Sequence, residues 1–156
     1  MATVIESVRI KAPLEDVFNF VYDWHNVAGY YEGIEGFEPT CEDPWGNGAR
    51  FACTIKTPVV GEQQLVLEVG DFVENHGWTR FSVTGPEWVE HWWFEALPGY
   101  PRETKVNDDL KYKVPVPVIG GLVDALAEKK RRAVQAQDTL HNNKLMVESR
   151  HQAVGG

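Results

Sequence analysis

The stretch VIGGLVDALAEKKRRAVQAQDTLHNNKLMVESR, residues Val118 to Arg150, decides the fold. Its spacing predicts one continuous helix with a single buried stripe, because apolar or small residues recur at intervals of three and four. The stripe comprises Ile119, Leu122, Leu126, Ala133, Gln137, Leu140 and Val147. At about 1.5 Å per residue, such a helix is roughly 45 Å long and needs a wide surface beneath it.

The preceding part of the chain supplies that surface as a sheet. Thr3 to Lys11 reads as a strand, and two short helices follow, one after Pro13 and one over Asp23 to Tyr31. From Ile34 to Val114, short strands alternate with turns rich in glycine and proline. We therefore expect an α+β fold, in which a curved antiparallel sheet of about seven strands wraps around the long C-terminal helix, with two short helices after the first strand.

Composition limits the class of protein. The 156 residues suit one domain, which we expect over residues 1–150, with residues 151–156 as a flexible tail. A net charge of −8 argues against a nucleic-acid partner, because such partners require a basic surface. The one basic cluster, Lys129 to Arg132, is interpreted as a solvated helix face with Glu128 as partner. The sequence contains no signal peptide and no apolar run of about 18 residues, so we expect no integral membrane association.

The two cysteines bear on the cellular compartment. Cys41 and Cys53 fall on adjacent predicted strands but are offset along the hairpin, too far apart for a disulfide. Two free thiols indicate a reducing compartment, so we expect a cytoplasmic protein. The sequence leaves the oligomeric state open.

Strand parity predicts which side chains face inward. Phe51 shares a face with Cys53 and Ile55, and Leu67 lies between Leu65 and Val69 on the next strand. The last strand points Val106, Asp108, Leu110 and Tyr112 the same way.

The hairpin around Gly85 and Pro86 allows two registers. A loop of two or four residues makes three opposite pairs, which are Val83 with Trp88, Phe81 with Glu90, and Thr79 with Trp92. This register is favoured because it gathers aromatic rings on one face, together with Phe94. A loop of three residues turns His91 and Trp93 to that face instead, since a slip of one residue inverts the side chains.

Glu90 is the sharpest candidate for chemistry. Among Trp88, Trp92 and Phe81 its carboxylate would lose solvation, which raises the pKa toward the range of a general acid or base. Asp108, Tyr112 or Gln137 would then be its partner. The alternative is that Glu90 pairs with Arg80 or Arg50, or faces outward in the other register. The five histidines show no spacing typical of a metal site, and no motif indicates a cofactor.

Two segments carry a resemblance to a known family. "VRIKAPLEDVFNFVYDW" (8–24) and "LKYKVPVPVIGGLVDAL" (110–126) resemble the opening and the strand-to-helix passage of the START-like (SRPBCC) helix-grip superfamily, in its polyketide cyclase/dehydrase-like branch. The resemblance implies a cavity between sheet and C-terminal helix for an apolar or amphipathic small molecule. The cavity wall is then expected to comprise Trp24, Tyr30, Tyr31, Phe51, Leu67, Phe81, Trp88, Trp92, Phe94, Leu110, Leu122, Leu126, Ala133 and Gln137.

Three functions fit this picture. The leading hypothesis is a protein that binds a hydrophobic or aromatic small molecule, lipid-like or polyketide-like. An enzyme of cyclase or dehydratase type would use Glu90 or Asp108 to move a proton next to a carbonyl, with Tyr112 or Gln137 holding the oxygen. A protein-interaction module would have a closed core instead.

Overall fold

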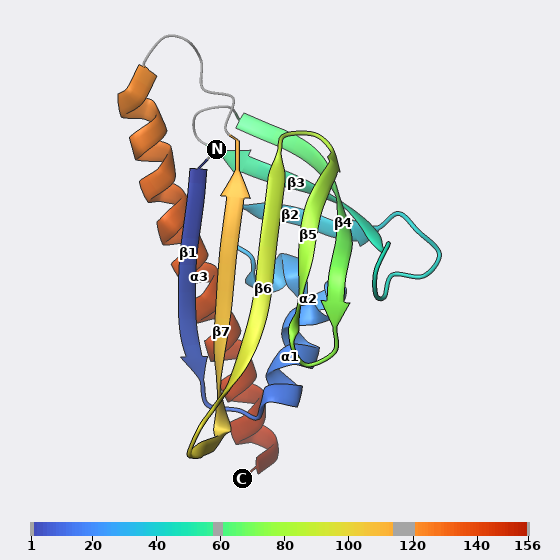
Figure 1. Ribbon diagram of the computed structural model, residues 1–156, viewed down its shortest axis with the longest axis vertical. Coiled ribbons are helices and arrows are strands. Elements are labelled where there is room, and N and C mark those ends of the chain that lie inside the picture. Colours follow the sequence, from blue (N-terminus) through green and yellow to red (C-terminus); the bar gives the residue numbers. More distant parts are fainter. Residues whose placement is uncertain (1, 58–60, 114–120, 156) are drawn as a thin grey trace.

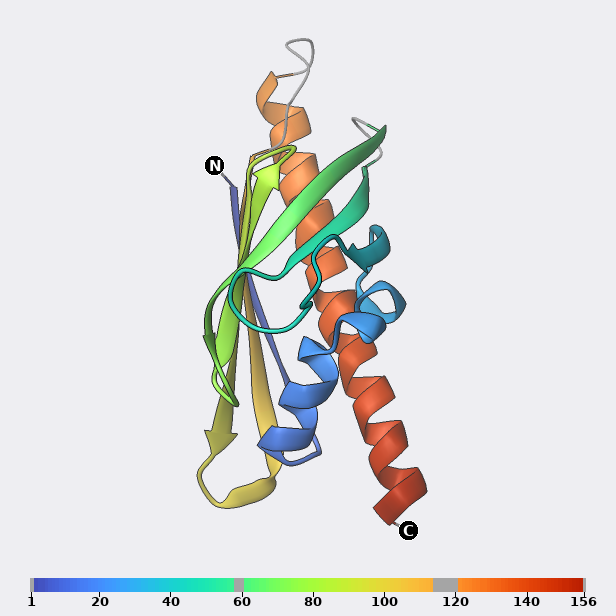
Figure 2. The ribbon, with the colours of Figure 1, turned by 90° about the vertical axis from the view of Figure 1, so that its right-hand side faces the viewer.

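The part of the chain that the structure describes folds into one antiparallel sheet with three helices on its concave side (Figures 1 and 2). The computed structural model describes residues 2–57, 61–113 and 121–155, with side chains in all of these except 57, 121–126 and 152–155. The elements in chain order are β1 (Ala2–Ile10), α1 (Leu14–Tyr22), α2 (Trp24–Tyr30), β2 (Ile34–Pro39), β3 (Arg50–Thr57), β4 (Gly61–Val73), β5 (Gly77–Thr84), β6 (Trp88–Leu97), β7 (Tyr100–Tyr112) and α3 (Gly121–Gly155). This order confirms the predicted α+β helix-grip architecture.

The sheet has the strand order β1-β7-β6-β5-β4-β3-β2, so β1 and β2 are its edges. Each neighbouring pair is antiparallel. The last strand, β7, pairs with the first strand, β1. The helix α3 packs beside β1, as both ribbon views show (Figures 1 and 2). Among the described residues, no helix is long and apolar enough to cross a membrane.

Local sequence explains the two short helices. Pro13 precedes α1, and Glu15 and Asp16 follow in its first turn, where the helix dipole favours negative charge. Asp23 ends α1 and caps α2, because its carboxylate accepts a hydrogen bond of 3.0 Å from the His25 backbone. The helices thus follow each other with no spacer and close one side of the concave face.

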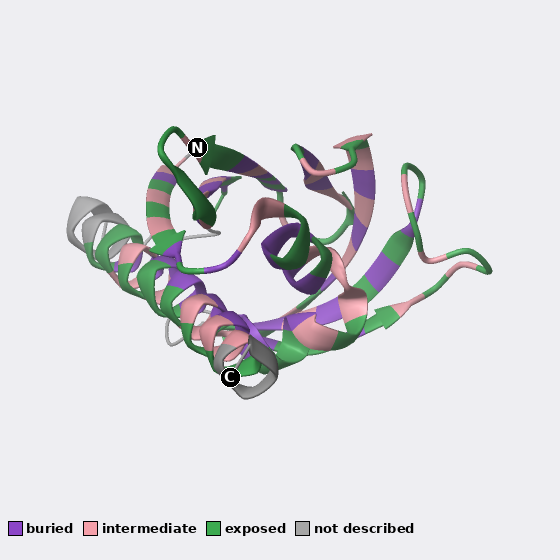
Figure 3. Cartoon of the chain, turned by 90° about the horizontal axis from the view of Figure 1, so that it is seen from below, coloured by how far each residue is buried: buried purple, intermediate pink, exposed green. Residues whose placement is uncertain are grey.

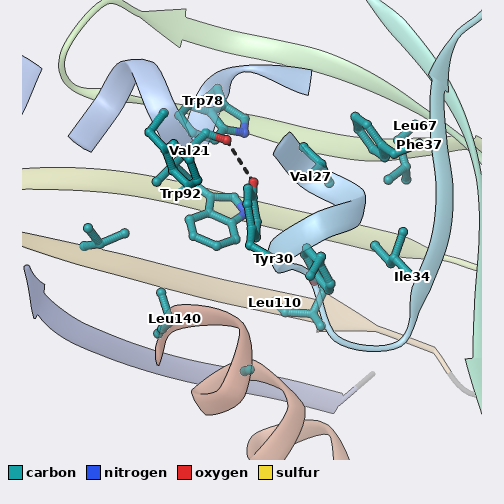
Figure 4. Close-up of a cluster of buried hydrophobic side chains, with 14 of the residues drawn as sticks. Val21, Val27, Tyr30, Ile34, Phe37, Leu67, Trp78, Trp92, Leu110 and Leu140 are labelled. Atoms are coloured by element: carbon teal, nitrogen blue, oxygen red, sulfur yellow. Dashed lines mark hydrogen bonds between the residues drawn. The ribbon is translucent and has the colours of Figure 1, made fainter. Parts of the chain in front are cut away.

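The core lies between the concave face and the helices (Figure 3). Trp78 and Trp92, opposite each other on β5 and β6, stack with ring centroids 6.1 Å apart. Beside them the Tyr30 hydroxyl donates a hydrogen bond of 2.8 Å to the carbonyl of Val21, which ties α2 to α1 (Figure 4). Both cysteines are free, and burial raises the pKa of the Cys53 thiol to about 12.

The favoured register of the β5–β6 hairpin is wrong. Phe81 lies opposite Val89, and Arg80 lies opposite Glu90. The inward positions of β6 are as predicted, whereas β5 turns Trp78 and Arg80 inward and leaves Phe81 on the outer face. Outside, the Phe81 ring covers Gly70 of β4, so an aromatic side chain shields a position that has no side chain of its own.

The buried stripe of α3 also differs from the predicted one. The prediction is confirmed at Leu140 and Val147, but Gln137 is exposed and Ala133 is half-buried. The buried positions before Leu140 are Glu128, Arg132, Ala136 and Thr139. The prediction is wrong because it assigned the buried face from apolar and small residues. The buried face includes Glu128 and Arg132, which are polar and pair with each other along the helix.

Candidate functional site

Glu90 lies at the centre of the concave face. Its carboxylate accepts hydrogen bonds from the Tyr31 hydroxyl, at the end of α2, and from the indole Nε1 of Trp92. Only 1% of the residue is exposed. Burial raises the pKa of the Glu90 carboxyl, while the two hydrogen bonds and the nearby charges of Arg80 and Arg132 oppose that rise.

Arg80 brings a positive charge next to Glu90. The two residues are opposite each other on β5 and β6, and Arg80 is buried. Its guanidinium lies over the rings of Phe37, at 4.9 Å, and Trp78, at 5.3 Å. Arginine stacks well on aromatic faces, so the rings compensate part of the cost of burying this charge.

Asp108 is a second buried carboxyl on the same face. It lies on β7 opposite Trp92 and is 1% exposed. Burial, followed by the negative charges of Glu90 and Asp109, raises the pKa of Asp108 well above its usual range. Its Oδ1 has no hydrogen-bond partner among the described residues. Glu90 and Asp108 are therefore two acidic groups in one interior, held in different surroundings.

Tyr112 and Arg132 form the part of the interior where β7 ends. Tyr112 lies opposite Trp88, with ring centroids 6.4 Å apart. From α3, the Arg132 guanidinium lies over both rings, 5.4 Å from Trp88 and 5.6 Å from Tyr112. Tyr31 also approaches Trp88, at 6.5 Å between centroids, which joins this corner to the surroundings of Glu90.

The structure brings together three predicted catalytic residues, Glu90, Asp108 and Tyr112, on one buried face. Most predicted wall residues are buried there too: Tyr30, Tyr31, Phe51, Leu67, Trp88, Trp92, Phe94 and Leu110. Trp24 is half-buried and stacks on His25 at 3.8 Å.

Two predicted wall residues lie elsewhere. Phe81 faces outward because of the register of β5. Gln137 is exposed, and its Nε2 donates to Glu6 Oε1 at 3.3 Å, so it links α3 to β1 rather than lining the interior. Leu122 and Leu126 lie outside the described side chains.

Sequence reasoning found the two buried carboxyls but placed the buried arginines poorly. The favoured register turns Arg80 outward, because Phe81 and Val83 make the opposite parity look like the apolar one, although Arg80 was an alternative partner of Glu90. The interpretation of Glu128 and Arg132 as part of a solvated helix face is also wrong, since both are buried. The spacing of four between Glu128 and Arg132, continued by Ala136, is the sequence pattern from which a shared buried face could have been predicted.

Three hollows outlined by described residues lie outside this interior. One, of about 580 Å³, is lined by Phe20 and Val147 between α1 and the C-terminal part of α3. One of about 330 Å³ lies over β2, β3 and β4, and another of about 350 Å³ lies beside Trp45. The cavity expected between sheet and α3 stays a prediction.

Comparisons with known proteins were made by sequence and by structure. No protein-family model and no curated protein sequence matches the chain. Solved structures match it over nearly its full length. Protein TTHA0849 of Thermus thermophilus superposes with a TM-score of 0.79 at 20% identity, covering 95% of this chain and 98% of that one.

Two further structures carry descriptive names. The ZhuI aromatase/cyclase from a Streptomyces species has a TM-score of 0.74 at 18% identity, covering 99% of this chain and 98% of that one. A START superfamily protein from Mycobacterium smegmatis has a TM-score of 0.64 at 18% identity, covering 92% and 98%. The chain therefore has the START-like helix-grip fold, as the two sequence segments predicted. Its similarity in fold extends to a second structure of this kind, the di-domain ARO/CYC protein StfQ from the steffimycin biosynthetic pathway, with a TM-score of 0.69 at 13% identity, covering 96% of this chain and 52% of that one.

Proposed function

We propose that the protein binds a hydrophobic, aromatic small molecule between the concave face of the sheet and α3. The observation that carries the proposal is the mixture of aromatic rings with buried polar atoms that have no partner among the described residues. These atoms include Trp78 Nε1, Asp108 Oδ1 and Tyr112 Oη. In closed cores, nine in ten or more buried polar groups are hydrogen-bonded. A group of unpaired polar atoms in one interior therefore supports the binding of a ligand that supplies their partners.

The energetics suit a ligand of modest size. Burying ten carbon atoms contributes roughly 8 kcal/mol at about 0.8 kcal/mol per methylene, before association costs that remove half or more of it. The remaining free energy of about 4 kcal/mol or less corresponds to a dissociation constant of about 1 mM or weaker, so micromolar affinity also needs polar contacts or a larger apolar ligand. The Trp88, Trp92 and Tyr31 rings provide flat surfaces for an aromatic ligand.

A second candidate function is an enzyme of cyclase or dehydratase type. It is favoured by Glu90, a buried carboxyl with a raised pKa that is held by Tyr31 and Trp92. Such a group can give a proton to, or take one from, a carbon next to a carbonyl. The resemblance in fold to an aromatase/cyclase supports this candidate. Glu90→Gln would then abolish turnover and leave ligand affinity nearly unchanged, whereas a fully active variant would exclude Glu90.

The binding proposal is tested by mass spectrometry of an organic extract from gently purified protein, with a denatured and washed sample as control. One apolar compound in stoichiometric amount would support the proposal and reveal its chemical class. An empty extract, together with no uptake of an uncharged fluorescent probe, would contradict it and favour an interaction module with a closed core.

A further inference from the structure

The corner formed by Trp88, Tyr112 and Arg132 has features that point to the ligand's chemistry. It lies where β6 begins and β7 ends, near the upper end of both strands in Figure 1. Two aromatic rings face each other there, and a guanidinium from α3 covers both. All three residues are at most 4% exposed.

Two polar atoms in this corner have no hydrogen-bond partner within the described part of the chain. They are the Nε of Arg132 and the hydroxyl of Tyr112. Each can donate a hydrogen bond, and the two side chains approach each other closely enough for a cation–π contact. A buried phenol and a buried guanidinium in contact, each with a donor that has no partner among the described residues, can both donate to one oxygen atom of a ligand.

The neighbouring carboxylate does not neutralise this site. Glu128 Oε1 lies 3.4 Å from Arg132 Nε, but Arg131 holds both oxygens of Glu128 with hydrogen bonds of 2.6 and 3.0 Å. Among the described residues, Arg132 also donates to the uncharged amide of Gln135, at 3.0 Å. One carboxylate shared by two arginines leaves one net positive charge, directed at the rings of Trp88 and Tyr112.

We propose that the ligand is an aromatic or conjugated acid whose anionic oxygen, a carboxylate, phenolate or enolate, is bound by Arg132 and Tyr112. This inference rests on the proposed function and adds the polar end of the molecule. The aromatic part of the ligand lies against Trp88 and Tyr31, and its charged end lies toward α3. A bound anion accepts charge-assisted hydrogen bonds from both unpaired donors and balances the positive charge of the buried guanidinium.

The test uses a matched pair of ligands that differ only in charge. Phenylnaphthylamine, an uncharged fluorescent probe, reports occupation of the interior, and it is displaced with naphthoic acid or with the methyl ester of that acid. We expect the acid to displace the probe at about a tenfold lower concentration than the ester, as a charged hydrogen bond predicts.

Variants assign the preference to residues. Arg132→Gln is expected to bring the acid-to-ester preference close to one, and Tyr112→Phe to reduce it several-fold. Lys130→Gln makes the same change of charge at an exposed position of α3 and should keep the preference. Because Arg132→Gln can weaken the fold, its melting curve is recorded, and Tyr112→Phe provides the second measurement, since it removes only an unpaired hydroxyl.

The outcomes separate the two proposals. Binding of the probe with equal displacement by acid and ester in the natural protein overturns the inference and leaves the binding proposal standing. A preference for the acid that survives in both Arg132→Gln and Tyr112→Phe also overturns it. Failure of the probe and of both naphthalene ligands to bind overturns the proposed function itself.

Discussion

Replacing Asp108 by asparagine is predicted to stabilise the free protein, increasingly so as the pH rises. Burial raises the pKa of this carboxyl well above its ordinary value of 3.8, and Oδ1 has no partner among the described residues. Above pH 3.8, the unfolded chain has released a proton that the folded chain still holds. The unfolded state therefore binds fewer protons, and the free energy of unfolding falls with pH until the folded pKa is reached.

The size of the effect follows from that linkage. Each pH unit between the two pKa values costs about 1.4 kcal/mol, so between about pH 5 and about pH 7 the wild type loses up to roughly 3 kcal/mol through this group. An asparagine side chain cannot ionise, so Asp108→Asn should gain that amount over the same interval.

The assay is urea unfolding, followed by tryptophan fluorescence at several pH values. Asp138→Asn is the control, because it makes the same substitution at an exposed position of α3. The control should keep nearly the wild-type dependence on pH. Equal dependence in Asp108→Asn and wild type, or a variant less stable than wild type at neutral pH, would refute the reasoning.

Three further substitutions test the packing around the site through the free energy of unfolding. Tyr31→Phe leaves one oxygen of Glu90 without its donor and should cost about 1–3 kcal/mol at neutral pH; a loss below about 0.5 kcal/mol would mean that the bond contributes nothing. Gly77→Ala places a Cβ against the Trp92 carbonyl oxygen, so we expect a loss of about 1–3 kcal/mol, and a neutral result would contradict the close approach of β5 and β6. Leu140→Ala should lower the free energy of unfolding by about 2–5 kcal/mol, because Leu140 is buried. Leu145→Ala, at an exposed position of the same helix, should change it by no more than about 0.5 kcal/mol. Equal losses would show that the buried face of α3 is misassigned.

The architecture was predictable because each element carries its own local signal. The residues after Pro13 specify a helix, and the regularly spaced turns in the middle of the chain specify strands. The long periodic stretch at the C-terminus specifies the last helix. Parity along β6 and β7 correctly placed Glu90, Asp108 and Tyr112 on the inner face. These inferences need only the backbone periods of helix and strand.

The errors arise where a tertiary contact outweighs side-chain polarity. On β5, hydrophobicity favours burying Phe81, yet Arg80 is buried because Glu90, Trp78 and Phe37 surround its charge. On α3, Arg132 is buried because Glu128 lies one turn away and aromatic rings lie beneath it. The spacing of four between Glu128 and Arg132 is a local signal. The aromatic partners of the two arginines, such as Phe37 for Arg80 and Trp88 for Arg132, lie far away in the chain, so no local pattern reveals them.

The central claim, a ligand held inside the fold, is tested most directly by the six indole N–H signals of protein labelled with ¹⁵N-tryptophan. Trp78, Trp88 and Trp92 are buried on the inner face, whereas Trp93 lies on the outer face and Trp45 is 46% exposed. Adding naphthoic acid should shift the signals of Trp88 and Trp92 and leave those of Trp45 and Trp93 in place. Shifts confined to Trp45 or Trp93, or no shift at saturating ligand, would contradict binding between the sheet and α3.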